Sequence, residues 1–92
     1  MDIAGNAVIG ATYSGSGAAP ANGLLVEGVV GIGTSAPASS ASLDVTSTNT
    51  GVLFPRMTTA QRDLIASPAA GLIIYNLDEK ALDVLMERHG SQ

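Results

Sequence analysis

The sequence predicts a mainly β fold of short strands with one short helix, assembled as an oligomer. Apolar runs of three or four residues recur between stretches rich in Gly, Ser and Pro, which is the spacing of short strands. One Thr-x-x-Gln capping motif, Thr58 to Gln61, marks a single helix start. Apolar residues make up 46% of the 92, largely Ala and Val, and aromatics only 3%. A chain this small with such small side chains has a weak core on its own, so we expect it to pack against copies of itself.

Residues 1–50 are predicted to form an extended β-repeat region rich in Gly, Ala and Ser. Residues 5–12 can be laid over residues 28–35, which places Ile9-Gly10 on Ile32-Gly33. Each copy is predicted to hold one short strand, with its glycines where the chain turns or passes close to another segment. The N-terminal half is therefore expected to gain its order from neighbouring chains.

Two further strands are expected in this half, at Leu24–Val26 and Leu43–Val45. Residues 13–22 and 34–42 are predicted loops, because Gly, Ser, Ala and Pro dominate them. The segment 46–50 fits a strand or a turn, since Thr favours sheets whereas Ser and Asn favour turns.

Residues 51–88 are predicted to be a compact strand–helix–strand region that holds the trimer together. The run 52–54 predicts a strand that Pro55 ends. The helix that starts at Thr58 is expected to stop at Ser67-Pro68. A second strand, residues 72–75, follows Gly71.

The end of the chain is predicted to turn once and then add a further element. Residues 76–79 form the turn. The pattern of residues 80–88 fits a strand or a helix, and we favour a strand that pairs with residues 72–75. Residues 89–92 are expected to be a loose tail.

Two motifs resemble a segment that recurs in phage fibre and tail-spike proteins and in related bacterial surface repeats. The longer motif is G-x-L-x-P-R-M-T-T-A-Q-R-D-x-I-x-x-P-x-x-G-L-x-x-Y-N, at residues 51–76. The other is the V-G-I-G-T…L-D-V repeat, represented by residues 26–34 and 43–45. Together they cover most of residues 5–76. The resemblance implies an intertwined homotrimer, with a β-helix-like or prism-like N-terminal part and a compact C-terminal part, in a virion or a surface structure.

The function implied is that of a virion structural protein made in the host cytoplasm. We expect a capsid decoration (cement) protein or short head fibre that stabilises the phage particle, with the major capsid protein as partner. The alternative is a tail-fibre or tail-adaptor component involved in host attachment, with a tail protein as partner. The preference for the capsid rests on length, because the 92 residues contain no long shaft and no large distal domain.

Charge and composition exclude several other classes. The net charge is −4 and the four basic residues are scattered, whereas nucleic-acid binding needs a basic patch. No apolar run approaches the roughly 20 residues that span a bilayer. Without cysteine, neither disulfides nor thiolate chemistry is available.

The search for chemistry yields no catalytic residue, cofactor site or metal site, and we expect no enzyme. His89 is the only histidine and lies in the predicted tail. The carboxylates of residues 78, 79, 83 and 87 are better explained by a solvated turn than by a metal site. Residues 14–17 lack the lysine and the following helix of a phosphate-binding loop. The glycines of residues 28–33 have the wrong spacing for a dinucleotide-binding motif, and no helix pattern follows them. A glycan-cleaving spike would need paired carboxylates in a groove.

Apolar side chains are the remaining candidates for function, as core or trimer interface. The predicted interface comprises Ile9, Ile32, Leu53, Phe54, Leu72, Ile74 and Tyr75. Arg56 is expected to pair with Asp63 or with a carboxylate of a neighbouring chain, the alternative being a bidentate contact with a ligand or partner.

Overall fold

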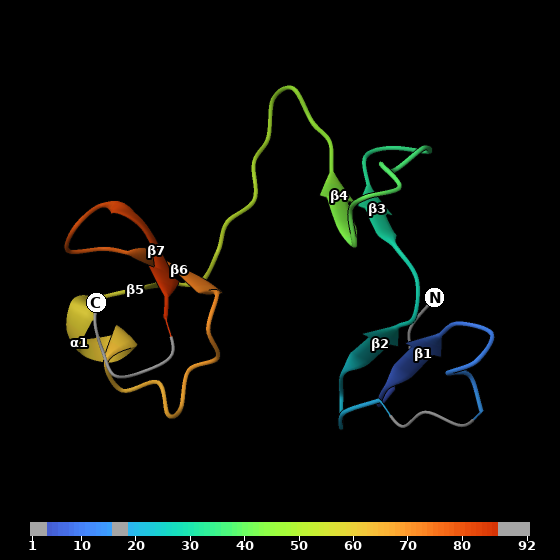
Figure 1. Ribbon diagram of the computed structural model, residues 1–92, viewed down its shortest axis with the longest axis horizontal. Helices are drawn as coiled ribbons and strands as arrows, with labels where there is room; N and C mark the ends of the chain where they lie inside the picture. The colour runs from blue at the N-terminus through green and yellow to red at the C-terminus, as the bar shows by residue number, and fades with distance from the viewer. Residues whose placement is uncertain (1–3, 16–18, 87–92) are drawn as a thin grey trace. The chain divides into compact units, whose positions relative to one another are not determined.

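The computed structural model describes residues 4–15 and 19–86, which fall in two compact units, Met1–Thr50 and Gly51–Gln92. Residues 16–18 of the first predicted loop, residues 87–88 of the predicted last strand and the predicted tail 89–92 lie outside the described residues. Figure 1 shows a chain of short strands and one short helix, so the predicted mainly β fold is confirmed. The elements are β1 (Ala7–Ile9), β2 (Leu24–Val26), β3 (Val30–Ile32), β4 (Leu43–Val45), β5 (Arg56–Met57), α1 (Thr59–Arg62), β6 (Leu72–Asn76) and β7 (Ala81–Leu85).

The N-terminal unit contains two separate pairs of parallel strands, β1 with β2 and β3 with β4. All four strands lie where the sequence predicted them. Each pair has three residues in register, starting with Ala7 opposite Leu24 and with Val30 opposite Leu43. A two-stranded sheet this short is marginal in water by itself, so each pair depends on what covers it.

The two pairs have the same hydrogen-bond pattern at both ends. At the start, Ala7 N donates to Gly23 O over 3.0 Å, and Val30 N donates to Ser42 O over 2.9 Å. At the end, the residue that follows the second strand donates to the last residue of the first strand. These bonds are Glu27 N to Ile9 O and Thr46 N to Ile32 O, both 2.9 Å. The repeat that the sequence predicted is therefore a repeated strand–loop–strand unit.

Glycine is required where each first strand ends, at Gly10 and Gly33. Their φ angles are +144° and +80°, a range that side chains with a Cβ rarely adopt. A side chain at Gly10 would collide with Glu27, and one at Gly33 with the backbone carbonyl of Thr46. Both glycines thus let the chain leave the first strand beside its partner.

Residues 46–50, which the sequence left between strand and turn, contain no strand. The hydroxyl of Ser47 accepts hydrogen bonds from the backbone N–H groups of Asn49 and Thr50, over 3.2 and 3.0 Å. A serine side chain that binds the backbone two and three residues ahead favours a turn over a ladder.

The C-terminal unit is built on a three-stranded sheet in the order β5–β6–β7. β5 is parallel to β6, and β7 is antiparallel to it, with Ile73 opposite Val84 and Tyr75 opposite Leu82. The prediction that the chain end forms a strand paired with residues 72–75 is confirmed.

The predicted first strand of this unit, residues 52–54, is wrong in position, because the strand is Arg56–Met57. Pro55 does not end the ladder but lies just before it. A proline has no N–H to donate, but its carbonyl accepts the N–H of Tyr75 over 2.9 Å. The ladder continues from Leu77 N to Met57 O over 2.8 Å.

The helix begins as predicted and ends sooner than expected. Thr58 is the N-cap of a complete capping box: its hydroxyl accepts from Gln61 N, and the Gln61 side chain accepts from Thr58 N over 2.9 Å. The expected end was Ser67-Pro68, but α1 stops at Arg62 with Asp63 as C-cap. The next N–H groups, of Leu64 and Ile65, bond three residues back, which tightens the chain into turns.

Very little of the described chain is buried. The buried apolar side chains are Ala19 and Ile74, and the buried polar one is Asn76. Among residues 4–15 and 19–86, seventeen large apolar side chains are exposed instead. No helix in the described residues is long and apolar enough to cross a membrane.

Candidate trimerisation surface

A buried asparagine organises the C-terminal unit. Asn76 is 0% exposed and lies at the end of β6. Its Nδ2 donates to Asp83 Oδ2 over 2.9 Å and to Thr59 Oγ1 over 3.0 Å. Its Oδ1 accepts the backbone N–H groups of Asp78 and Glu79, over 2.9 and 3.0 Å. One side chain therefore ties together the β6–β7 turn, β7 and the first turn of α1.

The Asp83 carboxylate also binds Arg62, the last residue of α1. Arg62 Nη1 lies 3.0 Å from Asp83 Oδ2, and Arg62 Nη2 lies 2.9 Å from Asp63 Oδ1. The hydrogen bond from Asn76, with that from Arg62, lowers the pKa of Asp83. The carboxylate is thus held in its charged form where it joins α1 to β7.

These contacts give the sheet an inner and an outer face. Ile74 and Asn76 are buried on the face turned towards α1, because side chains alternate along a strand. The intervening residues Ile73 and Tyr75 therefore point to the opposite, outer face.

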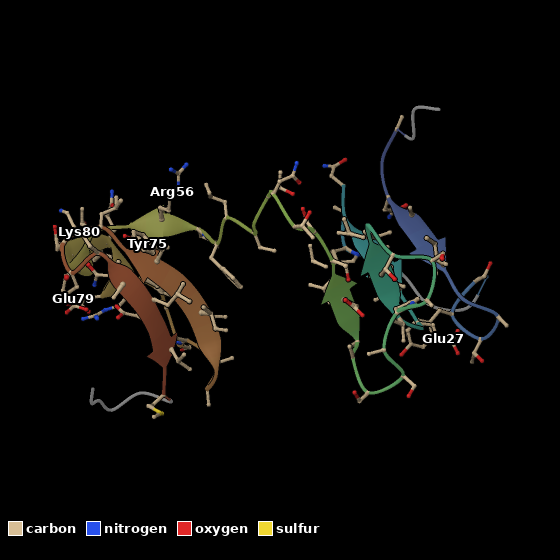
Figure 2. The ribbon with its side chains drawn as sticks, turned by 90° about the horizontal axis from the view of Figure 1, so that it is seen from above. Glu27, Arg56, Tyr75, Glu79 and Lys80 are labelled. Carbon is tan, nitrogen blue, oxygen red and sulfur yellow. The ribbon has the colours of Figure 1, made fainter. Side chains whose placement is uncertain are left out.

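The outer face is apolar and uncovered in the single chain. Leu82 and Val84 of β7 stand opposite Tyr75 and Ile73, and both are more than half exposed. Arg56 of β5 lies opposite Tyr75 at the edge of this face. Figure 2 shows Arg56 and Tyr75 on neighbouring strands, with Glu79 and Lys80 in the turn beyond them.

Residues 52–54 add a second apolar stretch before β5. Leu53 is 69% exposed, and Val52 and Phe54 are exposed too. The chain has no regular structure here, so these side chains are available for contact. Of the predicted interface residues, Leu53, Phe54 and Leu72 are exposed and Tyr75 is half-buried.

Ile74 is the exception among the predicted interface residues. It is only 2% exposed within the single chain, where it packs on the inner face of the sheet. Ile74 is therefore a core residue of the protomer.

Arg56 and Asp63 are not paired within the chain. Asp63 binds Arg62 instead, and in the described residues Arg56 has no ion pair. Arg56 lies on a strand next to Pro55, whereas Arg62 directly precedes Asp63 at the helix end, so adjacency decides the partner.

In the N-terminal unit, carboxylates hold the loops. Glu27 Oε1 accepts the backbone N–H groups of Thr12 and Tyr13, over 2.9 and 3.0 Å. Asp44 Oδ2 accepts the N–H of Ala38 over 2.9 Å. These backbone hydrogen bonds lower the pKa of both carboxyl groups. The predicted interface residues of this unit, Ile9 and Ile32, are both exposed.

Exposed apolar side chains, rather than clusters of reactive groups, are the candidate functional features of the described residues. No group of three His, Cys, Asp or Glu side chains among residues 4–15 and 19–86 is placed to hold a metal ion. Asp78, which the sequence placed in a solvated turn, accepts the N–H of Thr59 at the start of α1 over 2.9 Å. Its carboxylate has a structural partner.

A comparison with protein families identifies the region that carries these surfaces. Residues 31–90, about two thirds of the chain, match the family described as phage tail like trimerisation region. The chain belongs to this family. No curated protein and no solved structure matches it.

Membership of the phage tail like trimerisation family indicates a trimeric structural protein of a phage, and hence a component of the virion. The resemblance to phage fibre and tail-spike proteins is supported in this broader form. The matched region contains the whole β5–β6–β7 sheet with its uncovered face, together with β4 and most of β3.

Sequence reasoning missed several exposed apolar residues of the strands: Leu24, Leu43, Ile73, Leu82 and Val84. A signal for two of them was present. Leu82 and Val84 alternate with Ala81, Asp83 and Leu85, which is the period of a strand with two different faces. The pairing partner was needed to tell which face the protomer covers.

Proposed function

We propose that this chain is the trimerising segment of a phage tail fibre or tail adaptor, with a structural rather than an enzymatic role. The observation that carries the proposal is the apolar outer face of the C-terminal sheet, which lies within the family match and has no cover in the protomer. Exposed apolar faces rimmed by polar residues are typical of association sites.

In the proposed homotrimer, the outer face meets two further copies of the chain. Ile73, Tyr75, Leu82 and Val84 form the centre of the contact, joined by Leu53 and Phe54 from the predicted interface. Leu72 of that predicted set alternates with Ile73 and so lies on the inner face with Ile74. Association removes these side chains from water, which stabilises the trimer by about 25 cal/mol per Å² of apolar surface. The contact also supplies the core that each small protomer lacks.

Arg56 is proposed to form an ion pair across this interface. It stands at the edge of the outer face, and its predicted partner, Asp63 of a neighbouring chain, keeps an exposed side chain (63%) despite its bond to Arg62. A carboxylate that already binds one guanidinium can accept a second through its other oxygen.

The tail assignment replaces the expected capsid decoration role as our preferred proposal. The decoration role rested on the length of the chain, and no further observation supports it. The description of the matched family refers to the tail. Involvement in host attachment remains part of this proposal.

The position in the particle can be tested with an epitope tag added after Gln92. Intact phage particles carrying the tagged chain are labelled with gold-conjugated antibody and imaged by electron microscopy. We expect gold on the tail. Gold over the head would overturn the tail proposal and restore the decoration role, and particles with an untagged chain provide the background.

The interface can be tested by mass photometry of the purified chain. We expect a mass of three times 9.2 kDa. The double substitution Leu82→Ser with Val84→Ser should shift the population to monomers at the same concentration. Leu64→Ser is the control, because Leu64 is 82% exposed but lies after α1 and outside the strands. If the control dissociates the trimer and the double variant does not, the proposed interface is wrong.

A further inference from the structure

We propose that the β1–β2 pair, which precedes the matched family region, is an additional trimerisation module whose apolar face packs against the β1–β2 pairs of two other copies of this chain. This inference rests on the proposed trimer and extends it to a segment that the family match does not include.

The first argument is that β1–β2 and β3–β4 present equivalent faces. Paired residues of a parallel ladder lie on the same side, and side chains alternate along each strand. One face of the first pair therefore carries four apolar residues, Ala7, Ile9, Leu24 and Val26, and the equivalent face of the second pair carries Val30, Ile32, Leu43 and Val45.

The second argument is that the equivalent side chains are uncovered to the same degree. Ile9 and Ile32 are 59% and 55% exposed, and Leu24 and Leu43 are 59% and 58% exposed. Four large side chains of such short strands would not remain in water if the protomer could bury them. Both faces thus need a partner from outside the protomer.

The identity of that partner follows from the second pair. β4 and most of β3 lie inside the trimerisation region, so the Ile32–Leu43 face has a trimer partner in the proposed assembly. The first pair has the same register, the same flanking hydrogen bonds and the same glycine exit. In a cyclic homotrimer each segment of the chain occurs three times around one axis, so the copies of a repeated unit are available to one another as partners.

Charge is compatible with contact between identical copies. Neither apolar face contains a charged residue, and Asp44 points to the side opposite Leu43 and Val45. Glu27 directly follows Val26 and is held by the loop of its own unit through Thr12 and Tyr13. Three copies can therefore approach through these faces without bringing like charges together.

The arrangement can be tested by cross-linking, since the chain has no cysteine. Full-length Ile9→Cys, Ile32→Cys and Tyr13→Cys are treated with a short bis-maleimide and separated on a denaturing gel. Ile32→Cys is the reference in the matched region, and Tyr13→Cys is the control, because Tyr13 lies in a loop outside the strand faces. We expect Ile9→Cys to cross-link between chains as efficiently as Ile32→Cys, and Tyr13→Cys much less.

The outcomes separate this inference from the proposed function. If Ile32→Cys cross-links between chains and Ile9→Cys does not, the inference is overturned while the proposed trimer stands. Failure of both in a chain with monomer mass would overturn the inference and the proposed trimer together.

A second measurement avoids the dependence on cysteine geometry. Ile9→Ser with Leu24→Ser in the full chain should raise the concentration at which the trimer dissociates by roughly tenfold or more, because apolar surface is no longer buried there. The control is Tyr13→Ser with Val29→Ser, which removes exposed apolar side chains outside the strand pairs. Equal dissociation of wild type and the Ile9/Leu24 variant would contradict the inference.

Discussion

Asn76 and Asp83 are joined by a hydrogen bond of 2.9 Å from Nδ2 to Oδ2, and the same Asp83 oxygen accepts Nη1 of Arg62 over 3.0 Å. These bonds link the end of β6 and the middle of β7 to the only helix of the described chain. Since Asn76 is fully buried and all its polar atoms have partners, it fixes which face of the sheet is turned inward. The apolar outer face is the consequence.

Replacing Asn76 should destabilise the C-terminal unit strongly. In Asn76→Ala, the half-buried partners Asp83 and Thr59 each lose one donor, and the β6–β7 turn loses its acceptor. We expect a loss of about 2–4 kcal/mol in the free energy of unfolding, measured by urea denaturation at a fixed protomer concentration. Asn49→Ala, which removes an exposed hydrogen bond with Ser47, should change stability by less than about 0.5 kcal/mol. Equal effects would show that the buried network contributes little.

Gly33 should be intolerant of a side chain, and Gly51 should not. Gly33 has a φ of +80° and no room for a Cβ beside the carbonyl of Thr46, whereas Gly51 has open space. We expect Gly33→Ala to cost at least about 1–2 kcal/mol and Gly51→Ala to be neutral or slightly stabilising. Circular dichroism during thermal unfolding measures both. A Gly33→Ala variant as stable as Gly51→Ala would mean that β3 can leave β4 by another path.

Stability should fall in acid because three carboxylates have partners only in the folded state. Backbone hydrogen bonds lower the pKa of Glu27 and Asp44, and the bond from Asn76 lowers that of Asp83. Each contributes stability above its unfolded pKa and loses it as the pH falls through the lower, folded pKa. We therefore expect constant stability from neutral pH to about pH 5 and a decline below about pH 4.

The acid dependence can be assigned with Asp44→Asn, which removes one titrating group at nearly constant shape. The melting temperature of this variant, followed from neutral to acid pH, should fall less steeply below pH 4 than that of the wild type. Identical slopes would exclude a contribution from Asp44.

The capping box should have a measurable role despite the shortness of α1. Thr58→Ala removes the hydroxyl that accepts the N–H of Gln61, and we expect a cost of about 1 kcal/mol. Thr48→Ala, in an exposed segment outside the strands, is the control. Urea denaturation of the two variants side by side gives the difference, and no difference would mean that the helix start is held by Asp78 and Asn76 alone.

The sequence was most informative where a local rule decides the structure. Thr58 and Gln61 predicted the helix start because a capping box involves only residues three apart. The strands at residues 24–26, 43–45 and 72–75 were predictable from short apolar runs between turn residues, and the last of them extends one residue further, to Asn76. The repeat of Ile-Gly at residues 9–10 and 32–33 predicted a repeated unit, although only the shared hydrogen bonds show that the unit is a parallel pair.

Other features depended on partners far along the chain, and only the tertiary structure decided them. Residues 52–54 have the composition of a strand, but β5 lies at Arg56–Met57 because that is where Tyr75 and Leu77 offer N–H donors. Ile73 and Ile74 are adjacent residues of the same type. Ile74 belongs to the core and Ile73 to the surface, because Asn76 and α1 cover a single face of the sheet. Local propensity thus determined the secondary structure of most segments. Pairing and burial, which depend on contacts between distant residues, determined which of their side chains remain available to another chain.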